Sequence, residues 1–388
     1  MTANDAAGNV AVVGAGAVGT TVAHDLAAEG ATVTLYERGE VGAGSSGRAA
    51  GVCYDAFADR RDADLARRAI ERFRTLSGQD GFSFEPCPYV WLAREGDDRR
   101  GKAIREGAER MREHGLDVSL VDPDALGERF DSIRTDDVGT AAVTEGAGHT
   151  DPASYVDAMA ARAEREGATL RTNVEVGIRA DPPRVLVADG ATVDEREYDA
   201  TVDEREYDAV VVAAGAHTPG LLAEADVRIP VKPYRVQALV GRPEIDEPMC
   251  FDATGGFYLR PHPEGLLAGD GTEPVEADPD GYDRDGDDWF REEMHEALAH
   301  RLGHEIELER AWAGLCTATP DGNPLVGPVA DGLYVATGWQ GHGFMRAPAI
   351  GERLAGQVLG ENGIPGFDPG RFDGDEEFEI REGMAIEE

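Results

Sequence analysis

Residues 10–37 constrain the fold of this chain more than any other stretch of its sequence. They open with a short apolar run, which predicts a buried strand, and continue through a helix-compatible segment into a second apolar run that ends in Glu37. Between the first run and the helix stands the pattern G-x-G-x-x-G, formed by Gly14, Gly16 and Gly19. A strand, a glycine turn, a helix, a second strand and a terminal acid in this order form the dinucleotide-binding βαβ unit. The sequence therefore predicts an α/β protein with a Rossmann-like domain.

Each feature of this unit has a separate predicted task. Gly14 allows the tight turn, Gly16 lets the backbone approach a pyrophosphate, and Gly19 lets the helix and the strand pack closely. The N–H groups at the start of the helix attract the pyrophosphate, and Glu37 is placed to bind the ribose hydroxyls. The neighbours expected to touch the same ligand are Ala17, Val18 and Arg38. The unit leaves the cofactor open, because NAD and FAD both carry an ADP half.

The charge of the chain excludes one class of function. Its 388 residues include 76 acidic and 37 lysine or arginine side chains, a net charge of −39, and Lys102 and Lys232 are the only lysines. A nucleic-acid partner is excluded because it would require a basic face. The acids are spread through foldable segments, which argues against disorder. An acidic, lysine-poor surface is similar to that of proteins from extreme halophiles, so we interpret the charge as a property of habitat.

The sequence also carries signals about compartment. It contains no run of about eighteen apolar residues, and its first residues lack the basic and apolar regions of a signal peptide. The four cysteines have no C-x-x-C spacing, which indicates neither a metal site nor a disulfide framework. We therefore expect a cytoplasmic protein without a membrane span or a metal.

The rest of the chain alternates predicted helices and strands. Helices are predicted over residues 62–76, 99–114, 152–166, 287–302 and 349–360, with a short one within 120–130; strands are predicted over 88–93, 184–188, 208–215, 230–240 and 332–337, and a hairpin over 257–270. Residues 311–329 are predicted as a loop. Residues 192–200 and 201–209 are identical copies of TVDEREYDA, which we interpret as a local duplication in a hairpin or loop. The acidic residues from 368 onward are expected to form a solvated tail.

Several motifs along the chain together resemble one known family. They are GAGAVG with the later Glu37, the small-residue loop SSGRAAG, the strand DAVVVAAGA, the hairpin start FYLRP, the segment TPDGNPLVGP and the closing ATGWQGHGFMRAPAIG. In this order they are similar to the D-amino-acid oxidase-like FAD oxidoreductases, with the nearest likeness to the sarcosine oxidase, glycine oxidase and D-amino-acid dehydrogenase branches. The resemblance extends over residues 10–359, nearly the whole chain.

The resemblance implies FAD as the cofactor. It places the ADP half on the βαβ unit, and we expect Val174 on the adenine side and the end of the 208–215 strand, Ala213, Ala214 and Gly215, beside the cofactor. The small-residue loop is expected to hold the edge of the isoalloxazine ring through Ser45, Ser46, Arg48, Ala49 and Ala50. The turn of residues 338–345 is expected to meet the flavin through Gly338, Gly341, His342, Gly343, Phe344 and Met345. N–H groups of such a turn, with a helix N-terminus, stabilise negative charge on a reduced flavin. For His342, a structural role is the alternative.

The family's reaction moves a hydride from a carbon that bears nitrogen to N5 of the flavin, which gives an imine. The implied substrate is an amino acid or an N-methyl amino acid, whose carboxylate is expected to be clamped by a buried arginine. Where glycine oxidase and D-arginine dehydrogenase place this arginine, the chain has Cys316. We therefore predict Arg260 as the clamp, with Tyr258 beside it as a hydroxyl donor and Arg346 as a second candidate. A structural ion pair is the alternative for Arg260.

Other positions bear on the substrate pocket and on the electron acceptor. Tyr54 and Phe57 fall where the D-arginine dehydrogenase branch has substrate-facing aromatic residues, with core packing as the alternative. Gly314 stands where sarcosine oxidase has the cysteine that binds its flavin, which favours noncovalent FAD, although Cys316 could reach the ring from a shifted loop. Met345 stands where that relative has a lysine that assists the reaction with oxygen. A dehydrogenase with another electron acceptor is therefore favoured over an oxidase, with a positive charge supplied by an arginine or by His342 as the alternative.

The sequence predicts a division into domains and leaves several functions open. The FAD-binding domain comprises residues 1–85, 145–229 and 311–365, the substrate domain comprises 86–144 and 230–310 with a mostly antiparallel sheet and helices, and 366–388 form an acidic tail. The alternatives are a FAD-dependent 2-hydroxy-acid dehydrogenase, which needs a catalytic base, a flavin-binding subunit of a heteromeric amine dehydrogenase, and a NAD-dependent dehydrogenase. A homo-oligomer and a partner subunit both remain open, as does the identity of the electron acceptor.

Overall fold

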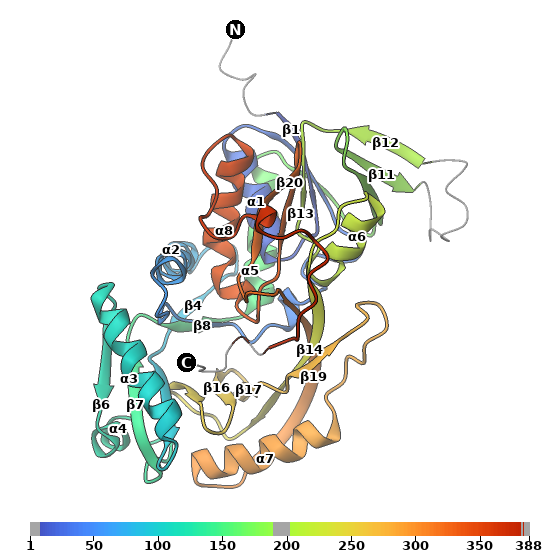
Figure 1. Ribbon diagram of the computed structural model, residues 1–388. Coiled ribbons are helices and arrows are strands. Elements are labelled where there is room, and N and C mark those ends of the chain that lie inside the picture. Colours follow the sequence, from blue (N-terminus) through green and yellow to red (C-terminus); the bar gives the residue numbers. More distant parts are fainter. Residues whose placement is uncertain (1–7, 189–201, 382, 384–388) are drawn as a thin grey trace.

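The computed structural model describes residues 8–188, 202–381 and 383, and it contains two large sheets that form the upper and lower parts of Figure 1. The upper sheet has six strands in the order β20 (Leu325–Ala330), β21 (Leu333–Thr337), β13 (Ala209–Val212), β1 (Asn9–Val13), β2 (Thr32–Tyr36) and β9 (Thr169–Arg171). The strands from β21 to β9 run parallel, and β20 is antiparallel to β21. The predicted βαβ unit, with α1 over Ala17–Ala28, lies at the centre of this sheet.

Both faces of the parallel sheet are covered. Helices α1, α5 (Pro152–Arg165) and α8 (Gly343–Val358) pack together on one face, and α2 (Arg60–Leu76) packs against α8. The other face carries α6 (Thr218–Glu224) and a small sheet of β10 (Val176–Arg179), β11 (Arg184–Ala188) and β12 (Val202–Glu206). Alternate residues of β1 follow this division, because Val10 and Val12 join one core and Ala11 and Val13 join the other. An all-apolar strand is therefore required here.

The lower sheet has nine strands and is mostly antiparallel. Its order is β18 (Glu273–Glu276), β14 (Lys232–Arg242), β17 (Gly265–Gly269), β16 (Phe257–His262), β15 (Met249–Asp252), β5 (Tyr89–Arg94), β7 (Val138–Thr144) and β6 (Val118–Val121), with β19 (Glu307–Ala318) paired to β14. Helix α3 (Asp98–Glu113) contacts β5, β6 and β7, while α4 (Pro123–Arg129) and α7 (Asp288–Leu302) share a core with this sheet. A short sheet of β3 (Val52–Cys53), β8 (Gly148–Thr150) and β4 (Phe84–Pro86) lies between the two parts. The predicted fold class is confirmed.

A buried ionic cluster ties β15 to its neighbours. The Asp252 carboxylate is 0% exposed and accepts hydrogen bonds from the guanidinium groups of Arg94 at 3.0 and 2.8 Å and of Arg301 at 3.1 and 2.7 Å. Its second oxygen accepts the N–H of Gly255 at 2.8 Å. Arg301, on α7, is also fully buried and reaches Asp137 at 3.0 Å. Such a cluster stabilises the fold only while every charge keeps its partners.

Two predicted loops are wrong in the C-terminal third. Residues 311–329 were expected in a loop, yet 311–318 belong to β19, which pairs with β14 from Lys232 to Arg242, and 325–329 belong to β20. Residues 343–345 were expected in a glycine-rich turn, yet they form the first turn of α8. In both places small residues conceal the element, because neither glycine nor alanine carries a periodic apolar signal. The pairing of β19 with β14 is set by contacts far apart in the sequence.

The expectation of a solvated C-terminal tail is wrong at residues 378–381, which we call the C-terminal strap. Ile380 is buried and Phe378 is half-buried against Tyr234 and Cys316. Lys232 donates a hydrogen bond to the carbonyl oxygen of Phe378 at 2.8 Å, with its ammonium 4.7 Å from the ring centroid. The strap therefore lies on the lower sheet.

Other sequence expectations concern absences and a repeat. In the part of the chain that the structure describes, no helix combines the length and the apolar character needed to cross a bilayer. The described residues also contain no group of three or more histidine, cysteine, aspartate or glutamate side chains placed to hold a metal ion. The first copy of TVDEREYDA lies outside the described residues, and the second supplies β12.

Candidate active site

The glycine turn between β1 and α1 leaves no room for side chains. Gly14 has a φ of +105°, and a Cβ atom on it would lie 2.5 Å from the carbonyl oxygen of Ala213. A Cβ atom on Gly19 would lie 1.9 Å from the carbonyl oxygen of Gly14. Only glycine is compatible with these two positions, because the obstructing atoms belong to backbone that is fixed in the parallel sheet. The turn thereby keeps the N-terminus of α1 close to the end of β1.

Glu37 and Ser46 organise the loops around this turn. The Glu37 carboxylate accepts the N–H groups of Ala15 and Gly39, both at 2.9 Å. Ser46, in the short 3-10 helix η1 (Ser46–Arg48), accepts the N–H of Ala17 at 3.0 Å at the start of α1. Carboxylate, hydroxyl and helix N-terminus thus converge on one face, which is the donor and acceptor set that a dinucleotide requires.

A single cavity of about 790 Å³ runs from this nucleotide end to the lower sheet. Its volume lies in the range of about 300–1,000 Å³ typical of ligand sites. The predicted residues that line it are Gly14, Gly16, Ala17, Val18, Glu37, Arg38, Ser45, Ser46, Arg48, Ala49, Ala50, Val174, Ala213, Ala214, Gly215, Tyr258, Cys316, Gly341, Gly343, Phe344 and Met345. Those that do not line it are Gly19, Gly338, Tyr54, Phe57, Arg260, His342 and Arg346.

The 338–342 turn and the N-terminus of α8 border the cavity. Thr317 at the end of β19 fixes the turn by accepting the N–H groups of Gly338 and Trp339, both at 3.1 Å. Cys316, beside Thr317, lines the cavity. Burial raises the pKa of the Cys316 thiol to about 12, so the thiol is protonated at neutral pH. A protonated thiol is a poor nucleophile towards a flavin ring.

Arg260 lies behind the cavity wall. Its guanidinium donates to the carbonyl oxygens of Ala50 at 2.5 Å and Pro261 at 2.6 Å, and the side chain is 4% exposed. Burial lowers its pKa to about 10, which leaves it charged at neutral pH. Since Ala50 belongs to the predicted flavin loop, Arg260 ties that loop to β16. The geometry favours this positioning role over a clamp on a substrate carboxylate.

We expect Arg260→Lys to weaken FAD binding by about tenfold, because an ammonium cannot donate to both carbonyl groups in the planar geometry of a guanidinium. The Michaelis constant for substrate is expected to stay within about threefold of wild type when FAD is saturating. Titration of the apoprotein with FAD and steady-state kinetics measure the two effects. Arg310→Lys, on the exposed side of β19, is the control. A large rise in the Michaelis constant with unchanged FAD affinity would instead support Arg260 as the residue that binds the substrate carboxylate.

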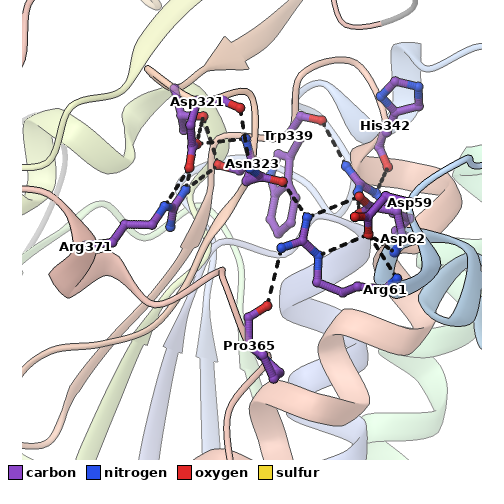
Figure 2. Close-up of polar contacts among 11 residues, drawn as sticks. Asp59, Arg61, Asp62, Asp321, Asn323, Trp339, His342, Pro365 and Arg371 are labelled. Atoms are coloured by element: carbon purple, nitrogen blue, oxygen red, sulfur yellow. Dashed lines mark hydrogen bonds and ion pairs between the residues drawn. The ribbon is translucent and has the colours of Figure 1, made fainter.

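His342, Tyr54 and Arg346 form a buried group next to the cavity. The His342 Nε2 lies 3.1 Å from the Tyr54 hydroxyl, and Phe57 packs edge-on against the imidazole with centroids 5.4 Å apart. The Asp62 carboxylate and the carbonyl oxygens of His342 and Trp339 surround the guanidinium of Arg346. Figure 2 labels Asp62, Trp339 and His342. Tyr54 belongs to the hydrophobic core, and Phe57 is half-buried against that core. Arg346 is engaged by Asp62 at 2.6 Å.

Burial, with the positive charge of Arg346 adding to it, lowers the pKa of His342 to about 3. The unfolded chain binds a proton on this histidine near pH 6.5, whereas the folded chain does not, so its contribution to stability is present above pH 6.5 and lost as the pH falls. We expect the free energy of unfolding to fall by about 1.4 kcal/mol per pH unit below about pH 6 from this residue. His342→Gln should flatten this dependence in urea titrations at several pH values. If the free energy of unfolding depended on pH equally in His342→Gln and in wild type, the lowered pKa of His342 would be contradicted.

Several cavity residues were missed by sequence reasoning. They lie on the lower sheet and its loops, and they include Gln237, Asp270, Tyr282, Arg284 and Trp312. Trp312 donates to the carbonyl oxygen of Arg48 at 3.0 Å, which joins β19 to the flavin loop. No motif marks these positions, because the sheet pairing that gathers them is long-range. The unusual G-D-G at residues 269–271 was the one local signal available.

The comparisons with known proteins identify the family. A profile of the DAO family, described as FAD dependent oxidoreductase, matches residues 9–357. The chain belongs to this family. FAD is its cofactor, and the glycine turn, the Glu37 carboxylate and the continuous cavity fit that cofactor. The resemblance inferred from the motifs is confirmed.

Members of the DAO family with known activities are similar to the chain over most of its length. Glycine oxidase from Pseudomonas aeruginosa is 26% identical over 94% of this chain and 97% of the relative. The 4-methylaminobutanoate oxidase (formaldehyde-forming) from Paenarthrobacter nicotinovorans is 28% identical over 93% of this chain, which spans 44% of that oxidase. The crystal structure of L-proline dehydrogenase from P. horikoshii superposes with a TM-score of 0.83 at 28% identity, covering 94% of this chain and 97% of the other. The chain spans 61% and 63% of FAD-dependent oxidoreductase domain-containing protein 1 from Xenopus laevis and Bos taurus.

Proposed function

We propose that this FAD-dependent oxidoreductase oxidises the carbon–nitrogen bond of an amino acid or an N-methyl amino acid to an imine. The observation that carries the proposal is the cavity, which continues from the nucleotide end to Tyr258 and Cys316 on the lower sheet. Relatives named for the oxidation of glycine, 4-methylaminobutanoate and L-proline share the fold or the sequence. When bound, FAD supplies the acceptor for the hydride.

The residues of this chain have separate tasks in the proposed reaction. The Rossmann-like part holds the ADP half, and the loop with Ser46 and Arg48 positions the flavin edge. Tyr258, whose pKa is raised by burial and by Asp270, keeps its proton and donates a hydrogen bond into the cavity. The lower sheet forms the far wall of the cavity and positions the amine for oxidation in its neutral form. The division into domains stays a proposal, and its boundary at residue 311 falls inside β19.

We further propose that FAD is bound noncovalently and that the enzyme is a dehydrogenase. The protonated Cys316 thiol supports the first point. The assignment as a dehydrogenase rests on the positions of the two lysines of the chain. Lys232 contacts the C-terminal strap, and Lys102 lies exposed on α3. Neither residue lines the cavity, where a positive charge would assist reduction of oxygen.

The test is anaerobic bleaching of the flavin band near about 450 nm in high salt. The panel contains D- and L-amino acids, sarcosine, L-proline, 4-methylaminobutanoate and 2-hydroxy acids. Bleaching by amines supports the proposal, and bleaching by 2-hydroxy acids alone replaces it. A yellow, folded protein that nothing in the panel bleaches would instead favour the flavin-binding subunit. Readmission of air then separates an oxidase, which reoxidises rapidly, from a dehydrogenase.

A further inference from the structure

Asp270 lies in the cavity at the end of β17, on the lower-sheet side. Gly269, the last residue of β17, is the register partner of Tyr258 on β16. The Tyr258 hydroxyl lies directly against Gly269, since a Cβ atom there would be 2.4 Å from it. Tyr258 and Asp270 both line the cavity, as does Thr272, whose hydroxyl donates to the Asp270 carboxylate at 2.9 Å. The Thr272 hydroxyl therefore contacts the Asp270 carboxylate, and the Tyr258 hydroxyl lies against the residue before it.

The backbone of Asp270 is strained. Its φ is +110°, whereas the other positive-φ residues that are not glycine in the described part of the chain lie between +50° and +59°. A side chain rarely adopts such a φ, and strain of this kind persists only where the surroundings impose it. Here the N–H groups of Asp270 and Gly271 both point to the carbonyl oxygen of Gln237, and a Cβ atom on Gly271 would lie 2.6 Å from the ring of Phe290. These contacts keep the backbone of Asp270 at this φ, with Asp270 in the lining of the cavity.

Protonated phenols and a thiol lie near this carboxylate, and the cations Arg346 and Arg260 act on the phenols of Tyr54 and Tyr258 among them. Burial, with the negative charge of Asp270 adding to it, raises the pKa values of the Tyr54, Tyr89 and Tyr258 phenols and of the Cys316 thiol, so all four keep their protons at neutral pH. On β14 and β18, Arg235 and Glu273 pair with each other, and Asp287 before α7 shares that arginine. A carboxylate among protonated phenols and a thiol is well suited to attract a cation.

We propose that Asp270 binds the ammonium group of the substrate and accepts one of its protons. This inference rests on the proposed oxidation of an amine. The N–H bond of the ammonium breaks, an O–H bond forms on the carboxylate, and the amine is left neutral with its lone pair free. Loss of a hydride from the adjacent carbon then gives an iminium ion, and no further oxidant is needed for the proton transfer. Tyr258 would hold the same nitrogen or a substrate carboxylate by its hydroxyl.

The experiment compares wild type with Asp270→Asn, which keeps the size of the side chain and removes its charge. Anaerobic stopped-flow measurements with sarcosine and with L-proline give two constants, the limiting rate constant for reduction of the flavin and the dissociation constant of the substrate. The quantity compared is the ratio of the first to the second. We expect this ratio to fall by about a hundredfold or more at about pH 7. The variant lacks the carboxylate that removes the proton, so it oxidises only the small fraction of the substrate amine that is already neutral in solution. The deficit should then shrink about tenfold per pH unit towards the amine pKa near 10. An unchanged ratio, or a deficit that does not shrink with pH, would overturn the proposal.

Two controls separate charge from a general loss of structure. Asp226→Asn makes the same change at an exposed residue with a φ of +59° outside the cavity, and its kinetics should equal wild type. Methylthioacetate, which has a neutral sulfur in place of the nitrogen, should bind to Asp270→Asn at least as tightly as to wild type, as measured by the flavin spectrum. Equal weakening of sarcosine and methylthioacetate would overturn the proposal.

The variants also distinguish this inference from the proposed function. If wild type is reduced by neither sarcosine nor L-proline nor another amine, the proposed function fails and this inference fails with it. If wild type is reduced and Asp270→Asn behaves identically, only this inference fails. Asp270→Gly provides an independent readout, since relief of the backbone strain should raise the melting temperature by about 2 °C or more while reduction by amines is lost. An unchanged or lower melting temperature of Asp270→Gly would contradict the inference that the backbone is strained at Asp270.

Discussion

Replacement of Asp252 by asparagine is expected to lower the free energy of unfolding by about 3–5 kcal/mol. The carboxylate is 0% exposed and neutralises the guanidinium groups of Arg94 and Arg301, and Arg301 is also fully buried. An amide keeps the volume but leaves both cations short of their partner. Because a typical domain is stable by only about 5–15 kcal/mol, this change removes a large share of the total.

Urea unfolding in high salt, followed by tryptophan fluorescence, measures this effect, since Trp91 lies on β5 beside β15. Asp136→Asn is the matched control, because Asp136 is 71% exposed and pairs with Arg134 at the surface. That variant should change stability by less than about 0.5 kcal/mol. Raising the salt concentration should not rescue Asp252→Asn, because buried charges are weakly screened. A midpoint equal to that of wild type would show that the cluster is not electrostatically important.

Gly19→Ala is expected to abolish tight binding of FAD. The added Cβ would lie 1.9 Å from the carbonyl oxygen of Gly14 and 3.1 Å from its carbon, and both are backbone atoms of the dinucleotide turn. Helix α1 must move away from β1 by about 1 Å or more to relieve this contact, and overpacking of this kind costs about 1–3 kcal/mol. The movement also displaces the N–H groups that bind the pyrophosphate. We expect FAD affinity to drop by at least about a hundredfold.

The ratio of absorbance at about 450 nm to that at about 280 nm in the purified protein reports this loss directly. Gly107→Ala, in α3, is the control, because the nearest atom to its added Cβ is a flexible Met111 carbon at 3.9 Å. It should retain a full complement of flavin, and its helix should be slightly stabilised. A fully yellow Gly19→Ala protein would show that the turn adapts more freely than the backbone contacts imply.

The nucleotide half of the molecule could be predicted because its signals are local. Strand, glycine turn, helix and acid follow one another within residues 10–37, and the structure forms β1, α1 and β2 there. The hairpin of residues 257–270 was also predicted, since alternating apolar residues flank a short turn. Helices α2 and α5 begin at Asp59 and Asp151, whose side chains accept N–H groups of their first turns. Each of these elements carries its own signature.

The substrate side could not be predicted to the same degree, because long-range pairing assembles it. The sequence of β19 mixes small and large residues without a regular period. The segment forms a strand because it pairs with β14, about seventy residues earlier in the chain. Arg260 was chosen as a clamp from its residue type, yet it points to the carbonyl oxygens of Ala50 and Pro261. Asp270 was not chosen, because nothing in a sequence shows that a backbone is held at a φ of +110°.

The scarcity of lysine makes the protein convenient for site-directed chemistry. Of its two side-chain amines, Lys232 is 23% exposed and held by the carbonyl oxygen and ring of Phe378, whereas Lys102 on α3 is 71% exposed. An amine-reactive dye should therefore attach to Lys102 before Lys232, without mutagenesis. No residue of α3 lines the cavity. A fluorophore or a surface linker placed there would leave the catalytic cavity open, and slow labelling of Lys232 would report how often the C-terminal strap lifts from the sheet.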